Sequence, residues 1–163
     1  MLLVPAVSHA QALPFVAAET DAASLGTAGA GLVETSSVAD ASFSNAAVIP
    51  FSDNKLDASV GYTMWQPSSS NILNVGVAYN VKSKFGVALG VHYGMNPSYD
   101  VTNESGAVAG VFAPKDIHVN AGLAWRFLPF LSLGANIGYA TSSLAEGHSY
   151  GALAADVFAM AKF

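Results

Sequence analysis

The segment Phe85–Met95, FGVALGVHYGM, alternates large apolar side chains with glycine, alanine and histidine along its whole length. Successive side chains of a β-strand point to opposite faces. Phe85, Leu89 and Tyr93 therefore share one face with the other large residues, and His92 shares the opposite face with the small ones. A segment of about eleven residues also has the length of a tilted membrane-crossing strand. It predicts a strand with one face suited to lipid and the other suited to the lumen of a barrel.

Five more segments repeat this alternation, and every charge in their interiors falls on the small or polar face. They are Leu56–Met64, Asn71–Val81, Ile117–Phe127, Leu131–Tyr139 and Leu153–Phe163. The six segments predict an all-β fold in which residues 55–163 form an antiparallel sheet.

The composition favours a membrane environment for this sheet. Hydrophobic residues make up 52% of the chain and charged residues only 10%, whereas about 25% is usual in soluble domains. No apolar run is long enough for a membrane-spanning helix, so the membrane would be crossed by strands. We therefore predict a transmembrane β-barrel in the bacterial outer membrane, in contact with its lipid. A soluble sandwich with an aromatic core remains the structural alternative, since soluble antiparallel sheets also alternate.

Aromatic residues gather near the predicted strand ends, as in the girdles of outer-membrane barrels. They are Tyr62, Tyr79, Phe85, Tyr93, Trp125, Phe127, Phe130, Tyr139 and Phe163. Short connections at Lys82–Lys84 and Leu128–Pro129 are expected on the periplasmic side. The longer connections, Asn96–Lys115 and Ser142–Tyr150, are expected as extracellular loops.

Six strands are too few for a bacterial barrel, because single-chain examples begin at about eight. Two more strands are possible at Ser24–Glu34 and Ala107–Ala113. The other possibility is that the six strands are part of a larger barrel. We favour the larger barrel, because each unpaired backbone group at an open edge costs several kcal/mol in hydrocarbon.

The N-terminal residues precede the predicted strands and divide into two parts. Residues 1–12, MLLVPAVSHAQA, combine a short apolar stretch with small residues, as in the last part of a signal peptide. A disordered N-terminus is the alternative. Residues 13–54 are rich in glycine and alanine, and they lie between this signal-peptide remnant and the first strand.

Two runs in this region carry a family resemblance. Residues 22–31 read AASLGTAGAG and residues 37–47 read SVADASFSNAA. They resemble the N-terminal signature of the FadL-like outer-membrane transport proteins and their PorV/PorQ-like relatives in Bacteroidetes. Those proteins carry a similar glycine-rich run and an acidic-alanine segment ending in Asn-Pro-Ala, where this chain has Ala46 in place of the proline.

The resemblance implies that residues 13–54 form a plug or hatch inside the barrel. Gly26, Gly29 and Gly31 would then allow close packing of the backbone against the barrel wall, since glycine has no side chain to obstruct it. Hydrogen bonds of three further residues would help to fix the plug in place; they are Asp40, Ser44 and Asn45. A flexible glycine-alanine linker is the alternative.

The resemblance also implies one of two functions. The first is passive transport of hydrophobic or amphipathic small molecules across the outer membrane. The second is a protein-interaction barrel of the type IX secretion pathway, whose partner would be a secreted protein. For that second function, Val111 and Phe112 are the most apolar residues of the long extracellular loop.

The remaining residues indicate no catalytic chemistry. The chain has no cysteine, and its net charge of −5, without a basic stripe, gives no indication of nucleic-acid binding. The spacing of the four histidines predicts no metal site, and we expect no enzyme activity and no cofactor. The polar residues on the face predicted to line the lumen are expected to be solvated side chains and not a hydrolase site. They are His92, His118, Asn120, Arg126, Asn136, Asp156 and Lys162.

Overall fold

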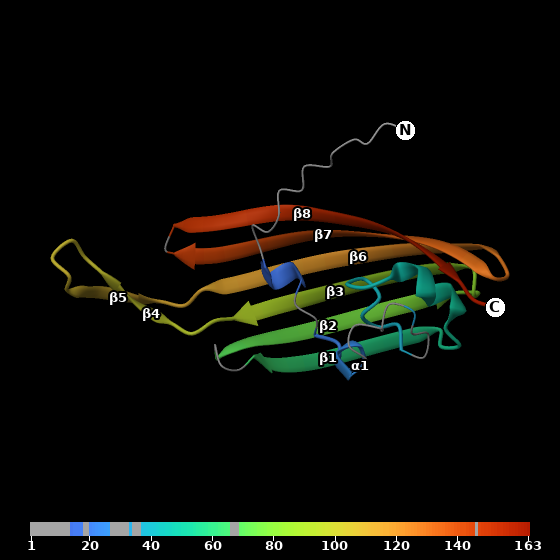
Figure 1. The fold of residues 1–163 in the computed structure, drawn as a ribbon, viewed down its shortest axis with the longest axis horizontal. Coiled ribbons are helices and arrows are strands. Elements are labelled where there is room, and N and C mark those ends of the chain that lie inside the picture. Colours follow the sequence, from blue (N-terminus) through green and yellow to red (C-terminus); the bar gives the residue numbers. More distant parts are fainter. Residues whose placement is uncertain (1–13, 18–19, 27–32, 34–36, 66–68, 146) are drawn as a thin grey trace, which may run out of the picture.

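The computed structural model describes residues 14–17, 20–26, 33, 37–65, 69–145 and 147–163. The predicted signal-peptide remnant, residues 1–12, lies outside these ranges. Most described residues form strands, and the prediction of an all-β antiparallel fold is confirmed (Figure 1). The elements are η1 Pro14–Ala17, α1 Ala22–Gly26, η3 Ala46–Phe51, β1 Leu56–Trp65, β2 Ser70–Val81, β3 Phe85–Met95, β4 Tyr99–Thr102, β5 Val108–Phe112, β6 Lys115–Leu128, β7 Leu131–Ala145 and β8 His148–Ala161.

Six strands form one sheet in the order β1-β2-β3-β6-β7-β8, and all neighbours in it are antiparallel. Each strand therefore lies beside the next sheet strand along the chain, as a sequence of hairpins requires. The part of the chain that the structure describes forms an open sheet, with β1 and β8 as its two edges.

The strand boundaries follow the predicted alternation closely in the middle of the sheet and less closely at its C-terminal side. The strand β3 has the predicted bounds, Phe85–Met95. The predicted loop Ser142–Tyr150 is wrong, because β7 continues to Ala145 and β8 begins at His148. Ser142 pairs with Tyr150 in this extension. Backbone hydrogen bonds between strands do not require apolar side chains. The two strands therefore continue to pair beyond the point where the alternation of apolar side chains ends.

Short turns lie at both predicted places, and the second is shifted by one residue. Lys82 and Ser83 both have positive φ values, of 54° and 51°, which is the backbone conformation that tight hairpin turns use. The turn between β6 and β7 contains only Pro129 and Phe130, and Leu128 pairs with Leu131 across it. These turns lie at one end of the sheet, which we call the short-turn end.

The opposite end carries a separate hairpin of β4 and β5, which projects beyond the sheet (Figure 1). The segment Ala107–Ala113 thus contains a strand, but that strand does not join the sheet, and its suggested place as an additional barrel strand is wrong. Pro97 and Pro114 flank the hairpin, and proline cannot donate to a sheet ladder. The other suggested strand, Ser24–Glu34, begins within helix α1, and its later residues, except Val33, lie outside the described ranges.

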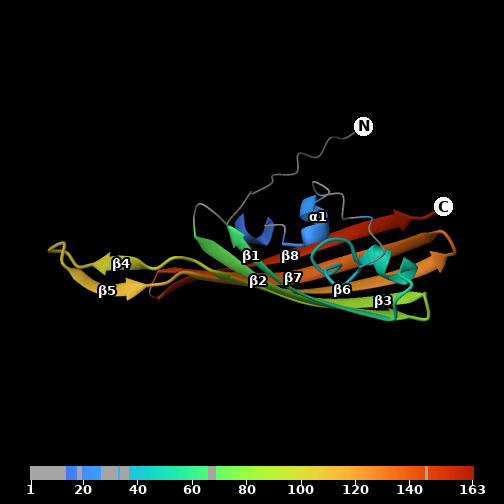
Figure 2. The same ribbon diagram turned by 90° about the horizontal axis from the view of Figure 1, so that it is seen from below.

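The two faces of the sheet differ completely in their surroundings. The outer face presents the large apolar residues to the exterior, whereas the N-terminal elements lie against the inner face, and the sheet curves around them (Figure 2). We call residues 38–51 the inner segment. Its helix η3 contacts β6, β7 and β3 most extensively. The small core joins apolar residues of the inner segment to alanines of the strands: Val38, Ala41, Ala46, Val48, Ile49, Ala78, Ala88 and Ala124.

Candidate functional site

Glycines on the inner face make room for the inner segment. A Cβ atom built on Gly134 would lie 2.5 Å from the backbone nitrogen of Ala47, and one built on Gly76 would lie 2.6 Å from the backbone oxygen of Ala39. Real Cβ atoms do not approach other atoms this closely. Three more glycines have equally close or nearly as close neighbours in the inner segment, and we call the five the glycine track: Gly76, Gly86, Gly90, Gly122 and Gly134.

The expected plug glycines are not among the residues of the glycine track. A Cβ built on Gly26 meets no described atom within 4 Å, so packing against the described residues does not explain glycine at this position. Gly29 and Gly31 lie outside the described residues. The glycines that permit close approach are in the strands, where the sequence shows them as the small members of each alternating pair. These glycines recur on the same face of successive strands, and that recurrence was the sequence signal from which their role could have been predicted.

Side chains of β7 bind backbone oxygens of the inner segment. Asn136 Nδ2 donates to the oxygens of Ala41 and Ser44, at 3.1 and 3.3 Å. Ser132 Oγ donates to the oxygen of Ala47. These carbonyl groups belong to an irregular stretch and a short 3-10 helix, so side chains supply hydrogen bonds that regular secondary structure does not.

The Asp40 carboxylate binds side chains of β1 and β2. Both of its oxygens accept hydrogen bonds from Ser59 Oγ, at 2.9 Å, and Oδ1 also accepts one from Asn74 Nδ2 at 3.5 Å. Burial raises the pKa of Asp40 above its ordinary value, and the nearby charge of Asp21 contributes to the increase. The carboxylate thus exchanges water for hydroxyl and amide donors on the sheet.

The other two predicted plug residues form hydrogen bonds with backbone atoms of the inner segment itself. Ser44 Oγ donates to the backbone oxygen of Asp40 at 3.3 Å. Asn45 Oδ1 accepts from the backbone nitrogen of Ala47 at 2.9 Å and so caps helix η3. Ala46, which stands at the position of the family's proline, is fully buried as the first residue of this helix.

Two inner-face histidines lie under the N-terminal residues. His92 and His118 pair across β3 and β6, and each is only 3% exposed. The Phe43 ring stacks on His92 with 3.6 Å between ring centroids, and Thr20 Oγ1 lies 3.0 Å from His92 Nε2. The expectation that these histidines are solvated is wrong, because the N-terminal residues cover this part of the inner face.

The remaining predicted lumen residues occupy different surroundings. Asn120 and Asn136 are buried, whereas Asp156 and Lys162 near the β8 edge are exposed. The Arg126 guanidinium donates to the backbone oxygen of Pro50 at 3.2 Å and lies 5.2 Å from the centre of the Phe51 ring. The seven residues share one face without forming one site. Among the residues that the structure describes, no group of three potential ligands is placed to hold a metal ion.

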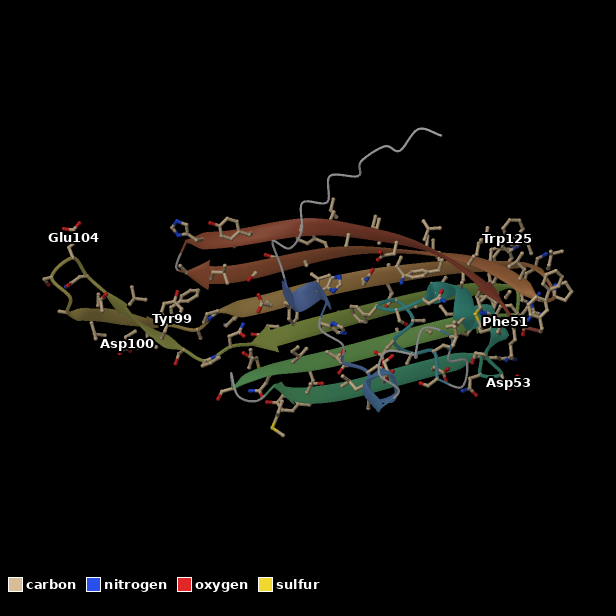
Figure 3. The ribbon with its side chains drawn as sticks, viewed as in Figure 1. Phe51, Asp53, Tyr99, Asp100, Glu104 and Trp125 are labelled. Carbon is tan, nitrogen blue, oxygen red and sulfur yellow. The ribbon has the colours of Figure 1, made fainter. Side chains whose placement is uncertain are left out.

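The outer face carries aromatic clusters at the short-turn end, where Trp125 is found in Figure 3. The rings of Phe85 and Trp125 are stacked, with 6.4 Å between centroids, and Phe127 lies 5.9 Å from Trp125. Phe130 and Phe163 form a second stacked pair at 5.7 Å. These exposed aromatic residues were predicted from their positions near strand ends.

No known family model matches this chain, and no curated protein matches it. No helix in the described part of the chain is long and apolar enough to cross a membrane. The site therefore rests on its own geometry. It is an interface between the inner segment and a curved sheet, built from glycines, amides and one carboxylate.

Proposed function

We propose that the six-stranded sheet is part of the wall of an outer-membrane β-barrel and that the inner segment is a plug inside it. The barrel would provide a passive route for hydrophobic or amphipathic small molecules across the outer membrane. One observation carries this proposal: the sheet exposes its large apolar side chains, and its four central strands bury their polar ones.

The exposure of large apolar side chains extends over all six strands, and the burial of polar side chains extends over the four central strands β2, β3, β6 and β7. On the outer face, Val60 is 76% and Val157 82% exposed, whereas Asn74 on the inner face is 2% exposed. Exposed apolar patches on soluble monomers rarely exceed a few hundred Å². A soluble sandwich would need a second apolar sheet over this entire face. Lipid chains satisfy the same requirement without any further protein.

The outer face also has the dimensions of a membrane-embedded surface. Tyr62 and Tyr93 belong to one row of paired residues across the sheet, and Phe85 and Trp125 belong to another. Along β3 the two rows are separated by about 27 Å, at about 3.4 Å per residue. The apolar band of outer-membrane barrels is about 25 Å tall and has aromatic girdles on both sides.

The open edges support a larger barrel. In a membrane, the free N–H and C=O groups of β1 and β8 need strand partners, because unpaired groups cost several kcal/mol each in hydrocarbon. The antiparallel order and the short turns at one end agree with barrel topology. Additional strands would therefore complete the wall.

The inner segment has the properties of a plug that can be displaced. It binds the wall through isolated hydrogen bonds and through alanines against glycines, and its apolar core is small. Its displacement would uncover a surface with both amide and alanine side chains, such as Asn74 and Ala88. Such a surface suits solutes that have both polar and apolar parts. The FadL-like resemblance supports this transport function.

One observation favours the alternative, a PorV/PorQ-like interaction barrel of the type IX secretion pathway. The β4–β5 hairpin projects from the sheet and exposes Val108 and Val111 by 61% and 68%. Tyr99 donates to the backbone oxygen of Leu144 at 2.5 Å and so ties the hairpin to β7. A secreted protein would then bind the hairpin.

The membrane placement is tested by inserting a charge into the outer face. Leu89→Arg should cost about 2 to 4 kcal/mol if Leu89 lies near the centre of the bilayer. Val111→Arg, on the projecting hairpin, is the matched control and should cost close to nothing. The measurement is refolding yield into lipid vesicles. Equal yields for the two variants would overturn the membrane placement.

The two functions are separated by replacing residues 99–112 with a short glycine-serine loop. A transport barrel should keep its uptake of a fluorescent fatty acid by cells, because the hairpin lies outside the sheet. An interaction barrel should lose copurification of its secreted partner. Loss of fatty-acid uptake with intact insertion would contradict the transport proposal.

A further inference from the structure

We infer that the outer face at the short-turn end is a binding site for an anionic phospholipid, with the acyl chain in an apolar groove and the headgroup phosphate at Lys82 and Lys84. This inference rests on the proposed membrane placement and adds a specific lipid ligand to it. It also requires that the short-turn end face the leaflet that contains such lipids.

A shallow groove of about 440 Å³ crosses the outer face beside the aromatic cluster. Ala135 lies between Leu123 and Val157 in the sheet register, and the small alanine side chain leaves a depression between its larger neighbours. The lining is almost entirely apolar. The side chains that form it are Phe85, Val87, Leu123, Trp125, Leu133, Ala135 and Val157.

The groove continues toward the middle of the apolar band. A second groove, of about 480 Å³, shares Val87 and Leu123 with the first and extends to Ala121 and Leu89. An apolar cavity of about 150 Å³ is enough to bind benzene, so each groove accommodates a stretch of acyl chain. The grooves run from the aromatic cluster into the region that lipid tails would occupy.

A positive charge lies at the aromatic end of the groove. Lys84 Nζ is 5.9 Å from the centre of the Phe85 ring, and Phe85 is one of the lining residues. Lys82 belongs to the same tight turn. Trp125 stacks beside Phe85, and tryptophan is enriched at the level of lipid headgroups.

Charge is distributed unevenly between the two ends of the sheet. Five of the six lysines and arginines lie at or next to the short-turn end: Lys55, Lys82, Lys84, Arg126 and Lys162. The sixth, Lys115, begins β6 at the opposite end, where the projecting hairpin carries Asp100 and Glu104 (Figure 3). Asp53 and Asp57 also lie at the short-turn end (Figure 3), where the five cations outnumber them. An anionic headgroup is therefore attracted to the short-turn end and repelled by the hairpin.

The test compares spin-labelled phosphatidylglycerol with spin-labelled phosphatidylcholine in phosphatidylcholine vesicles that contain the refolded protein. The wild type should immobilise phosphatidylglycerol preferentially. K82Q/K84Q should reduce this preference by about fivefold per lysine, which corresponds to about 1 kcal/mol for each charge near the surface. K115Q is the control and should leave the preference unchanged.

The groove is tested by Ala135→Leu, which fills its floor. This variant should release immobilised phosphatidylglycerol, whereas Ala155→Leu, on the same face outside both grooves, should not. Insertion into vesicles is measured in parallel for every variant. Normal insertion without lipid preference, or a preference equally reduced by K115Q, would overturn the lipid site alone. The refolded protein is the complete barrel, in which additional strands pair with β1 and β8. Failure of this wild-type barrel to insert would overturn the membrane placement itself.

Discussion

The two faces of this sheet use the same six strands in opposite ways. The outer face carries large apolar residues that remain exposed, and the inner face carries small and polar residues that the inner segment buries. Leu89 and His92 are three residues apart on β3, yet the leucine is 58% exposed and the histidine 3%. Burial in this molecule is therefore set by which face the inner segment covers, and not by the hydrophobicity of each side chain.

The energetic basis of burial also differs between the faces. Fully burying one large aliphatic side chain stabilises a fold by roughly 1.5 to 3 kcal/mol. The large side chains of the outer face are exposed, so contacts within the described chain do not provide this stabilisation. The inner face depends on hydrogen bonds, each worth about 1 kcal/mol net, and on close contact at the glycine track. The inner face should therefore be sensitive to steric change, and the outer face to charge.

The largest inner-face effect is expected for Gly134→Val. Its Cβ would meet the backbone of Ala47 at 2.5 Å, and a backbone cannot move aside as a flexible side chain can. Overpacking of this kind costs about 1 to 3 kcal/mol or more, and it should displace the inner segment. Limited proteolysis would then cut within residues 38–51.

Gly110→Val is the matched control for this substitution. Gly110 also lies in a strand, but a Cβ there meets no described atom within 4 Å. The control should remain resistant to proteolysis in the inner segment. Equal protection in both variants would show that the glycine track does not position the segment.

A smaller effect is expected for Asn136→Ala. This change removes the donors to the oxygens of Ala41 and Ser44 and leaves buried carbonyl groups without partners, at a cost of about 1 to 3 kcal/mol. Asn71→Ala, whose exposed amide donates to the nearby backbone oxygen of Ser69 at 3.5 Å, is the control. Chemical denaturation monitored by accessibility of residues 38–51 should show a lower midpoint for the first variant only.

The smallest effect is a pH dependence from Asp40. Because burial raises its pKa above 3.8, the protonated form favours docking. That contribution is complete below the unfolded pKa and is lost as the pH rises through the folded pKa. Protection of the inner segment from protease should therefore weaken slightly as the pH rises from the unfolded to the folded pKa of Asp40. Asp40→Asn should remove the slope, and an unchanged slope would assign it to another group.

The strands could be predicted from sequence because their alternation is local. The bounds of Phe85–Met95 follow from eleven consecutive residues. The extension of β7 through Ser142 was missed because ladder pairing depends on the partner strand and not on side-chain type. A strand was predicted at Ala107–Ala113, where β5 lies, but β5 pairs with β4 in a separate hairpin and does not join the sheet.

The inner face could be predicted only in part. The alternation gave the correct side for His92, His118 and Asn136, but not their burial. Burial depends on contacts such as that between Asn136 and Ala41, which are 95 residues apart in sequence. The role of the strand glycines could not be predicted for the same reason. Each lies against a residue of the inner segment that is far away in sequence, and no local pattern identifies that residue.

The long separation between the inner segment and β7 has a consequence for folding order. Ala41 and Ala47 are bound by Asn136 and Ser132, 95 and 85 residues later in the chain. Contacts of such high sequence separation form slowly, because the intervening chain must lose its freedom first. The inner segment is synthesised before the strands, and its hydrogen bonds with Asn136 and Ser132 can form only once β7 has been synthesised. Full protection of this segment from protease should therefore appear late in folding, after β7 has joined the sheet.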